Sequence, residues 1–263
     1  MRSFLFTRLF VLILLAAISG FAQQTASTDP QAAAAVQKAL AALSSATTLT
    51  DATLSGTARR IAGSDDETGT AILKITAAGS CRLDLTLPSG ARSEVRTASS
   101  SGPAGKWSGP DGAAHSTAYH NLSTDAGWFP AFTLTGLSAS NGLVKFIGQE
   151  TRNGVAVLHL SAAQRSTLSD ANAASFVQHL SQTEVFLDAS SYLPVAVTFN
   201  THPDSNALLD IPVEMRFSDY RAVNGAQIPF HVQKFLNNSL ILDLQFQNVS
   251  VNSGLSAGDF VIP

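Results

Sequence analysis

The six histidines are the side chains best suited to acid–base chemistry or metal binding in this sequence. His115 and His120 lie five residues apart and close to Asp125, and imidazole together with carboxylate suits zinc. Their spacing matches no known pattern of zinc ligands, so we predict no metal site and no cofactor. The other four histidines are scattered along the chain: His159, His179, His202 and His231.

Hydrolytic chemistry has equally little support. A serine–histidine–aspartate set can be assembled on paper from any serine-rich chain, but no turn here presents a strained serine. The sequence contains no Gly-x-Ser-x-Gly, no His-Glu-x-x-His and no P-loop motif. We therefore predict no catalytic residue and keep a secreted hydrolase or metal enzyme only as a remote alternative.

Large aromatic side chains give the stronger signal. Both tryptophans, Trp107 and Trp128, fall within an irregular stretch at about residues 99–137, together with Phe129 and Phe132. Aromatic residues on such a connection can close over an apolar ligand, or they can plug one end of a barrel. The two alternatives differ in the outcome of Trp128→Ala, which weakens ligand binding in the first case and severely destabilises the fold in the second.

Basic residues concentrate between Arg59 and Lys106. Seven lie in this stretch, six of them on expected strands: Arg59, Arg60, Lys74, Arg82, Arg92, Arg96 and Lys106. An ordinary solvated sheet face explains such a strip, and an acidic partner or lipid headgroups are the functional alternative. No aromatic residues interleave with these arginines, and the chain has a net charge of −3, so nucleic acid is not expected as a partner.

The elements that position these residues begin with a helix. Val36, Leu40 and Leu43 recur in steps of four and three, which predicts a helix over Gln31–Ser45. Strands dominate the remainder, at Thr53–Ile61, Thr68–Thr76, Gly142–Gly148, Val155–Ser161, Thr183–Asp188 and Leu193–Asn200. A loop is expected at Ser99–Gly112, and further helices at Ser123–Phe129, ending at Pro130, and at Ser169–Leu180.

Arg82–Leu87 alternates strictly between leucine and polar residues, which predicts a half-buried strand. We expect Pro88-Ser89-Gly90 to form the turn into a partner strand at Ala91–Thr97. Pairing of Leu87 with Ala91 then leaves Leu83 and Leu85 facing inward and all the charges of both strands in water.

The C-terminal third reads as three strands, Val213–Tyr220, Ile228–Leu236 and Leu240–Val251. Asn224-Gly225 and Asn237-Asn238 supply the two turns. Leu242 and Leu244 share one face of the last strand. The layout predicts an antiparallel α+β chain whose strands could curl into an open barrel.

Residues 1–22 have the features of a secretory signal peptide. Arg2 and Arg8 precede an apolar run over Leu9–Ile18, and Gly20-Phe21-Ala22 fits a cleavage site. The run is shorter than the ~20 residues that span a bilayer. We expect cleavage near Ala22, a linker over 23–30, one domain over 31–263, and a periplasmic or secreted location. A single cysteine provides no internal disulfide.

The closing segment contains Phe217-Ser218-Asp219-Tyr220, then Asn224-Gly225 and Ile228-Pro229, with Asn252 and Phe260 near the end. With the signal peptide, first helix, antiparallel strands and mid-chain insert, it resembles the LolA/LolB/RseB-like family of periplasmic lipoprotein and lipid carriers.

The resemblance implies an unclosed barrel with covering helices, whose concave face binds acyl chains. It predicts an exported, non-catalytic binding protein for a lipid, acyl chain or lipoprotein, without a membrane span. The expected ligand-binding residues are Leu83, Leu85, Trp107, Trp128, Phe129, Phe132, Leu242 and Leu244. The alternative is a structural, interaction or sensor module of the envelope with a filled barrel and a protein partner.

Overall fold

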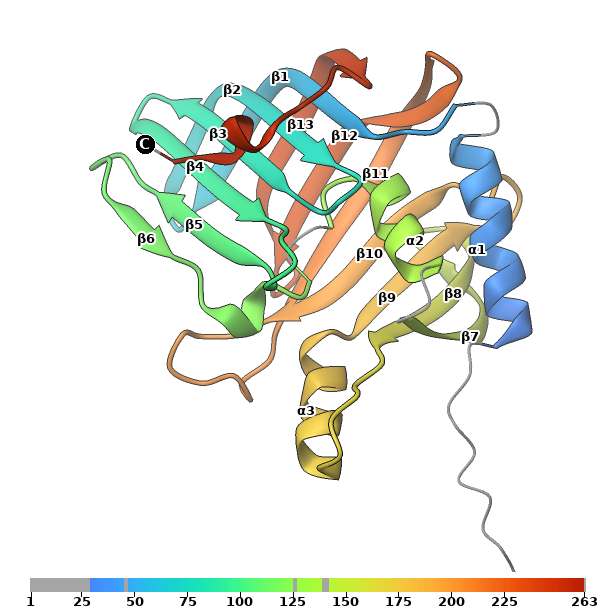
Figure 1. Cartoon of the computed structure of the whole chain (residues 1–263). Coiled ribbons are helices and arrows are strands. Elements are labelled where there is room, and N and C mark those ends of the chain that lie inside the picture. Colours follow the sequence, from blue (N-terminus) through green and yellow to red (C-terminus); the bar gives the residue numbers. More distant parts are fainter. Residues whose placement is uncertain (1–28, 45–46, 125–126, 139–141, 263) are drawn as a thin grey trace, which may run out of the picture.

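A computed structural model describes residues 29–44, 47–124, 127–138 and 142–262 (Figure 1). The predicted signal peptide, its cleavage site, nearly all of the predicted linker and Asp125 lie outside these residues. No helix in the described ranges is long and apolar enough to cross a membrane.

Within these ranges, one antiparallel sheet of thirteen strands makes up most of the fold. The strands are β1 (Asp51–Ala62), β2 (Asp65–Thr76), β3 (Cys81–Leu87), β4 (Gly90–Thr97), β5 (Ala104–Ser108), β6 (Ala114–Ser116), β7 (Gly142–Arg152), β8 (Val155–Gln164), β9 (Thr183–Asp188), β10 (Pro194–Thr201), β11 (Ile211–Val223), β12 (Ala226–Leu236) and β13 (Ser239–Val251). The sheet curls strongly without closing, as an open barrel does (Figure 1). The predicted α+β open barrel is therefore confirmed.

The strand order explains the shape of the chain path. β1 pairs with β13, β2 to β6 extend the sheet on one side, and β12 back to β7 extend it on the other. Consecutive strands are neighbours everywhere except between β6 and β7, which form opposite edges of the sheet. The connection after β6 must therefore travel from one edge to the other.

This connection crosses the inner face of the sheet. A Cβ atom on Gly127 would lie 3.2 Å from Phe199 of β10 and 3.6 Å from Met215 of β11, so the backbone runs directly over these strands. The connection holds a 3-10 turn, η1 (Tyr119–Asn121), and the helix α2 (Pro130–Ser138). The expected helix over Ser123–Phe129 is wrong: Pro130 begins a helix instead of ending one, because proline fits the first helical turn.

The first helix, α1 (Pro30–Leu43), confirms the helix predicted over Gln31–Ser45. The Asp29 carboxylate caps it by accepting a hydrogen bond of 2.8 Å from the Gln31 backbone N–H. Its apolar side, which includes Val36 and Leu43, is buried, and α1 and α2 pack side by side over the inner face near β7 (Figure 1). The two helices therefore close one end of the open barrel.

The third helix, α3 (Ala171–Leu180), also occurs where a helix was predicted, with Asp170 as its cap. In contrast to α1, it has no buried residue and projects away from the sheet (Figure 1). The C-terminal segment includes the 3-10 turn η2 (Ala257–Phe260), and Phe260 and Ile262 cover Val95 on the outer face of β4.

The predicted pairing of Leu87 with Ala91 is wrong by one residue. Leu87 pairs with Gly90 across a two-residue turn, where three residues were expected. A shift of one residue moves every side chain of a strand to the other face. Arg92 consequently lies opposite Leu85, and Glu94 lies opposite Leu83. Both charged side chains are therefore on the inner face of the sheet, whereas they were expected on the outer face, in water.

Of two further predictions from the sequence, one is partly wrong and one is confirmed. The predicted loop over Ser99–Gly112 is partly wrong, because Ala104–Ser108 forms β5 and lengthens the sheet. The turns at Asn224-Gly225 and Asn237-Asn238 are confirmed, and all four residues have the positive φ angles that type I′ turns require. These turns fix the register of β11, β12 and β13.

Candidate functional site

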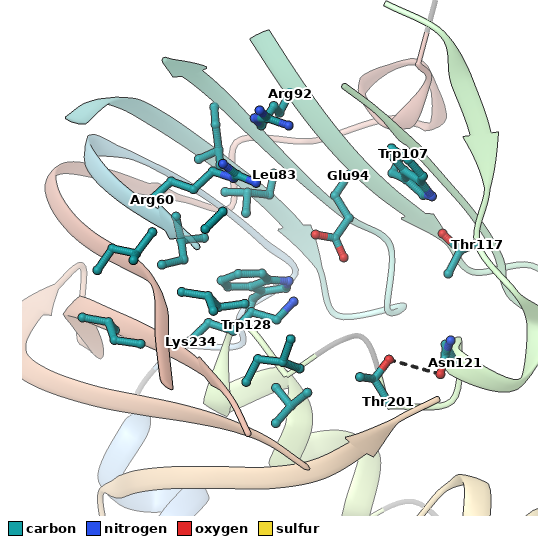
Figure 2. A pocket seen from close by; sticks show the side chains of 18 of the residues that line it. Arg60, Leu83, Arg92, Glu94, Trp107, Thr117, Asn121, Trp128, Thr201 and Lys234 are labelled. Carbon is teal, nitrogen blue, oxygen red and sulfur yellow. Dashed lines mark hydrogen bonds between the residues drawn. The ribbon is translucent and has the colours of Figure 1, made fainter. Parts of the chain in front are cut away.

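A cavity of about 940 Å³ lies on the inner face of the sheet, between the β1–β5 side and the crossing connection (Figure 2). Its volume is near the upper end of the usual range for ligand pockets, about 300–1,000 Å³. The exposed residues Gly63, Trp107 and Ser239 are part of its wall, so the cavity reaches the surface.

The deep part of the cavity is apolar. Its lining includes Leu83, Leu85, Trp128, Phe199, Val213, Leu236, Leu240 and Leu242. Leu83 and Leu85 come from one strand and Leu242 from a strand of the other half of the sheet, so the curl of the sheet brings the two halves of the chain together around this space. A lining of this kind can shelter a hydrocarbon chain from water.

Charged side chains line the same cavity. Arg60, Arg92 and Lys234 supply three cations and Glu94 one carboxylate (Figure 2). The cations therefore outnumber the carboxylate here, although the whole chain has a net charge of −3. The charge of the cavity favours the anionic group of a ligand over a cationic one.

The three cations of the cavity wall have different partners. The Nζ atom of Lys234 lies 5.0 Å from the centre of the Trp128 ring, and a guanidinium nitrogen of Arg60 lies 3.9 Å from a carboxylate oxygen of Glu67. The Nη2 atom of Arg92 donates to Ser89 Oγ at 3.4 Å, while its buried Nε has no hydrogen-bond partner among the described residues. Arg92 thus keeps a buried N–H donor that a ligand's anionic group could use.

Five of the eight predicted ligand-binding residues line this cavity: Leu83, Leu85, Trp107, Trp128 and Leu242. The other three, Phe129, Phe132 and Leu244, do not line it and lie in the hydrophobic core. Trp107 is 45% exposed and stacks on His115 with ring centres 4.3 Å apart, whereas Trp128 is only 4% exposed. Trp107 therefore lies at the mouth of the cavity, and Trp128 lies in the hydrophobic core.

The expected basic strip does not form one surface. Strand alternation places Arg60 and Arg92 in the cavity, while Lys74 and Arg82 lie on the outer face. There Lys74 binds Asp259 at 2.7 Å and Arg82 binds Asp84 at 2.7 Å. The hydrogen bond from Lys74 and those from Ser256 lower the pKa of Asp259 to about 2.

A serine–histidine–aspartate row does exist, on the outer face of β11, β12 and β13. Ser218 Oγ lies 3.1 Å from His231 Nδ1, and His231 Nε2 lies 2.9 Å from Asp243 Oδ1. The two ring nitrogens are used in the reverse order of a hydrolytic triad. None of the three residues lines the cavity, so the row is a polar cross-strand network of the sheet surface.

The histidines suspected of metal binding do not meet. His115 stacks on Trp107, His120 Nε2 lies 3.2 Å from the carbonyl oxygen of Pro203, and Asp125 lies outside the described residues. His202, taken as scattered, lies with His179 and Asp210 instead. Burial lowers the pKa of His202 below its usual 6.5, against the raising effect of its hydrogen bond to Asp210.

Sequence reasoning missed the cavity residues Arg60, Arg92, Glu94 and Lys234 as a group. The available signal was the Pro88-Ser89 turn: read as a two-residue hairpin loop, it places Arg92 beside Leu85 and Glu94 beside Leu83.

The sequence matches no protein-family model and no curated protein sequence. The fold, by contrast, has clear relatives among solved structures. One is a Vibrio parahaemolyticus domain described as an outer membrane lipoprotein-sorting protein, with a TM-score of 0.55 at 14% identity, covering 88% of this chain and 96% of that one.

A LolA superfamily protein from Nitrosomonas europaea matches with a TM-score of 0.53 at 10% identity, over 88% of this chain and 97% of that one. A DUF1329 family protein from Desulfovibrio piger matches with a TM-score of 0.54 at 10% identity, over 89% and 98%. Identities this low show the fold alone. The resemblance drawn from the sequence is confirmed at that level: the chain has the open-barrel fold of LolA superfamily proteins.

Proposed function

We propose that this protein is an exported, non-catalytic carrier that shelters an acyl chain of a lipid or lipoprotein in its barrel. The observation that carries the proposal is the cavity of about 940 Å³, with leucines and Trp128 inside and three cations in its wall. Burial of each methylene contributes about 0.8 kcal/mol, so a long acyl chain gains several kcal/mol on entering such a space.

The three cations indicate which chemical group the ligand carries. Because Arg60, Arg92 and Lys234 line a cavity that is otherwise largely apolar, the favoured ligand is amphipathic, with an anionic carboxylate or phosphate near these side chains. Glu94 in the same wall attracts a cationic headgroup, but three cations stand against this one carboxylate, so an anionic group is favoured overall.

The comparisons and the sequence support the same role. One similar structure is described as an outer membrane lipoprotein-sorting protein domain, and another is described as a LolA superfamily protein. The signal peptide predicted over residues 1–22 supports a periplasmic or secreted location.

One observation favours the second candidate, an envelope interaction module with a filled barrel. Trp128 and Phe129 are nearly fully buried and cross the inner face of the sheet, as a plug would. The space beside them is nevertheless open, and Trp128 itself forms part of its wall. A partly plugged barrel with room for one ligand fits both facts.

Replacing Arg92 by glutamine is expected to weaken binding of a long-chain fatty acid about tenfold, because a hydrogen bond to a charged group contributes about 1.5–3 kcal/mol. Binding of the fatty alcohol of equal length should change less than about twofold, since it has no anionic group. Dissociation constants from displacement of a fluorescent fatty acid measure both.

Arg221→Gln is the matched control, because Arg221 forms an exposed ion pair with Asp219 and does not line the cavity. It should leave both affinities unchanged. Equal losses for acid and alcohol in Arg92→Gln would show that Arg92 supports the cavity wall instead of binding the headgroup.

A further inference from the structure

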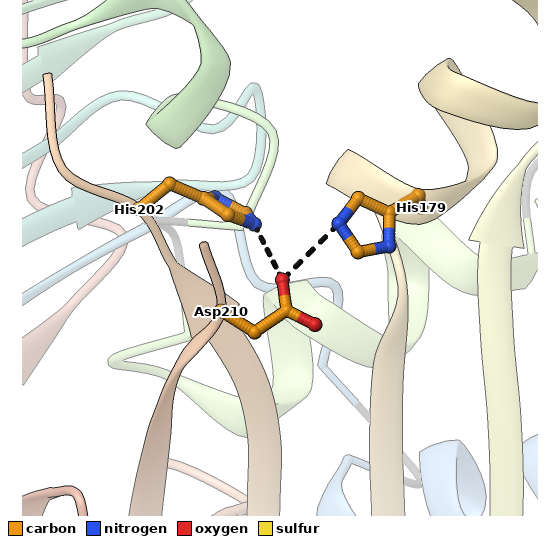
Figure 3. Close-up of side chains that lie close together, drawn as sticks. All are labelled: His179, His202 and Asp210. Carbon is orange, nitrogen blue, oxygen red and sulfur yellow. Dashed lines mark hydrogen bonds and ion pairs between the residues drawn. The ribbon is translucent and has the colours of Figure 1, made fainter. Parts of the chain in front are cut away.

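A second polar cluster lies where α3 meets the loop between β10 and β11, and none of its three side chains lines the cavity. It consists of His179 at the end of α3, His202 just after β10, and Asp210 just before β11 (Figure 3). Their ligating atoms all lie within 4.8 Å of one another. Figure 3 shows both rings directed at one carboxylate oxygen.

Two of the three distances between the ligating atoms are close to those of a metal site. Nε2 of His179 and Nε2 of His202 each lie 3.1 Å from Asp210 Oδ1. In a tetrahedral zinc site with ligands at about 2.0–2.1 Å, neighbouring ligand atoms are separated by roughly 3.3 Å. These two distances need little change, and the two imidazole nitrogens, which lie within 4.8 Å of each other, need to approach by at most about 1.5 Å for one ion to contact all three atoms.

The hydrogen bonding of the cluster is incomplete without a cation. The His202 side chain is only 1% exposed, and both of its ring nitrogens face oxygens: Nε2 faces Asp210 Oδ1, and Nδ1 faces Asn121 Oδ1 at 3.4 Å. A neutral ring carries one N–H, so one nitrogen lone pair points at an oxygen lone pair. The buried Nε2 of His179 has no hydrogen bond of good geometry among the described residues.

Asn121 supports this arrangement from behind. Its Oδ1 accepts from the His202 backbone N–H at 2.8 Å, and its Nδ2 donates to the His202 carbonyl oxygen at 2.8 Å, which fixes the residue in place. A metal-binding histidine usually donates its other N–H to an oxygen of this kind. His120, whose ring centre lies 5.9 Å from that of His202, is turned toward the Pro203 carbonyl oxygen.

We propose that His179, His202 and Asp210 bind one divalent first-row metal ion, Zn²⁺ in the first instance, with water at the remaining position. Two imidazoles and a carboxylate are ligands that Zn²⁺ accepts, and the Asp210 side chain is 43% exposed, so the site is open to solvent. None of the three ligands lines the acyl cavity, although Asn121, which holds His202 in place, is part of the cavity wall.

A bound metal ion would link α3 to the loop between β10 and β11. Because α3 has no buried residue, few contacts hold it against the sheet. An ion shared by His179 of the helix and by His202 and Asp210 of the loop would tie these segments together. Zn²⁺ therefore orders α3.

The test uses the untagged chain after treatment with a chelator. Titration with Zn²⁺ against a chromophoric competitor should give one equivalent bound, and His179→Ala and Asp210→Asn should each weaken binding at least about tenfold. His115→Ala is the control and should bind normally, because His115 stacks on Trp107 and does not belong to the cluster. Both test positions are at least partly exposed, so these variants should fold.

Hydrogen exchange supplies a readout that a surface histidine would not give. Zn²⁺ should slow amide exchange across α3 by about tenfold or more in the unmodified chain and leave it unchanged in Asp210→Asn. Absence of tight Zn²⁺ binding, or binding that both variants retain, would overturn the proposal, as would binding without any protection of α3.

Discussion

Trp128→Ala is expected to lower the free energy of unfolding by about 3–5 kcal/mol, the usual cost of removing a large buried aromatic side chain. Trp128 is 4% exposed and belongs to the main hydrophobic core, and Lys234 stacks over its ring. The connection that carries it crosses the inner face, so a void there loosens both halves of the sheet. Guanidinium unfolding followed by circular dichroism measures the change.

Trp107→Ala is the matched control, since Trp107 also lines the cavity but is 45% exposed. It should cost less than about 1 kcal/mol. The chain has two tryptophans, so each variant leaves one reporter, and an apolar ligand should change the emission of both variants. A Trp128→Ala protein that is as stable as Trp107→Ala but binds far more weakly would show a ligand lid without a plug.

Leu85→Asp is expected to weaken binding of a long-chain fatty acid about 100-fold. The new carboxylate would lie in the apolar wall and opposite Arg92 across the β3–β4 pair, where it can form an ion pair with that guanidinium. The ion pair lets the variant fold, but it occupies the cation expected to hold the ligand's anionic group and repels that group. Displacement titration gives the affinity, and a cooperative thermal transition verifies the fold.

Thr86→Asp introduces the same charge one residue later, on the outer face of the same strand, where Thr86 is exposed. Its affinity for the fatty acid should equal that of the unmodified chain. Similar losses in both variants would mean that charge on β3 acts on the whole sheet, and the cavity would lose its place in the proposed function.

Local patterns predicted most of the fold. The leucines of β3 alternate with polar residues, and the asparagine turns of the C-terminal strands have the conformation that their type requires. The spacing of Val36, Leu40 and Leu43 produced the first helix. In each case neighbouring residues in sequence carry the information, and the structure follows it.

The positions of the candidate site residues depend on strand register and on contacts between residues far apart in the sequence. A turn of two residues instead of three decides whether Arg92 and Glu94 lie in water or beside Leu85 and Leu83, and the residues Pro88-Ser89-Gly90 allow both. His202 and Asp210 are eight residues apart, but His179 joins them only because α3 returns to the same corner of the sheet. Neither arrangement is encoded in the spacing of the residues alone.

The most direct test of the acyl-carrier function is a series of straight-chain fatty acids of about 10 to 18 carbons. If the cavity buries the chain, each added methylene should lower Kd about fourfold, corresponding to about 0.8 kcal/mol, until the space of about 940 Å³ is filled. Affinity that does not change with chain length, or absence of binding at every length, would contradict the account.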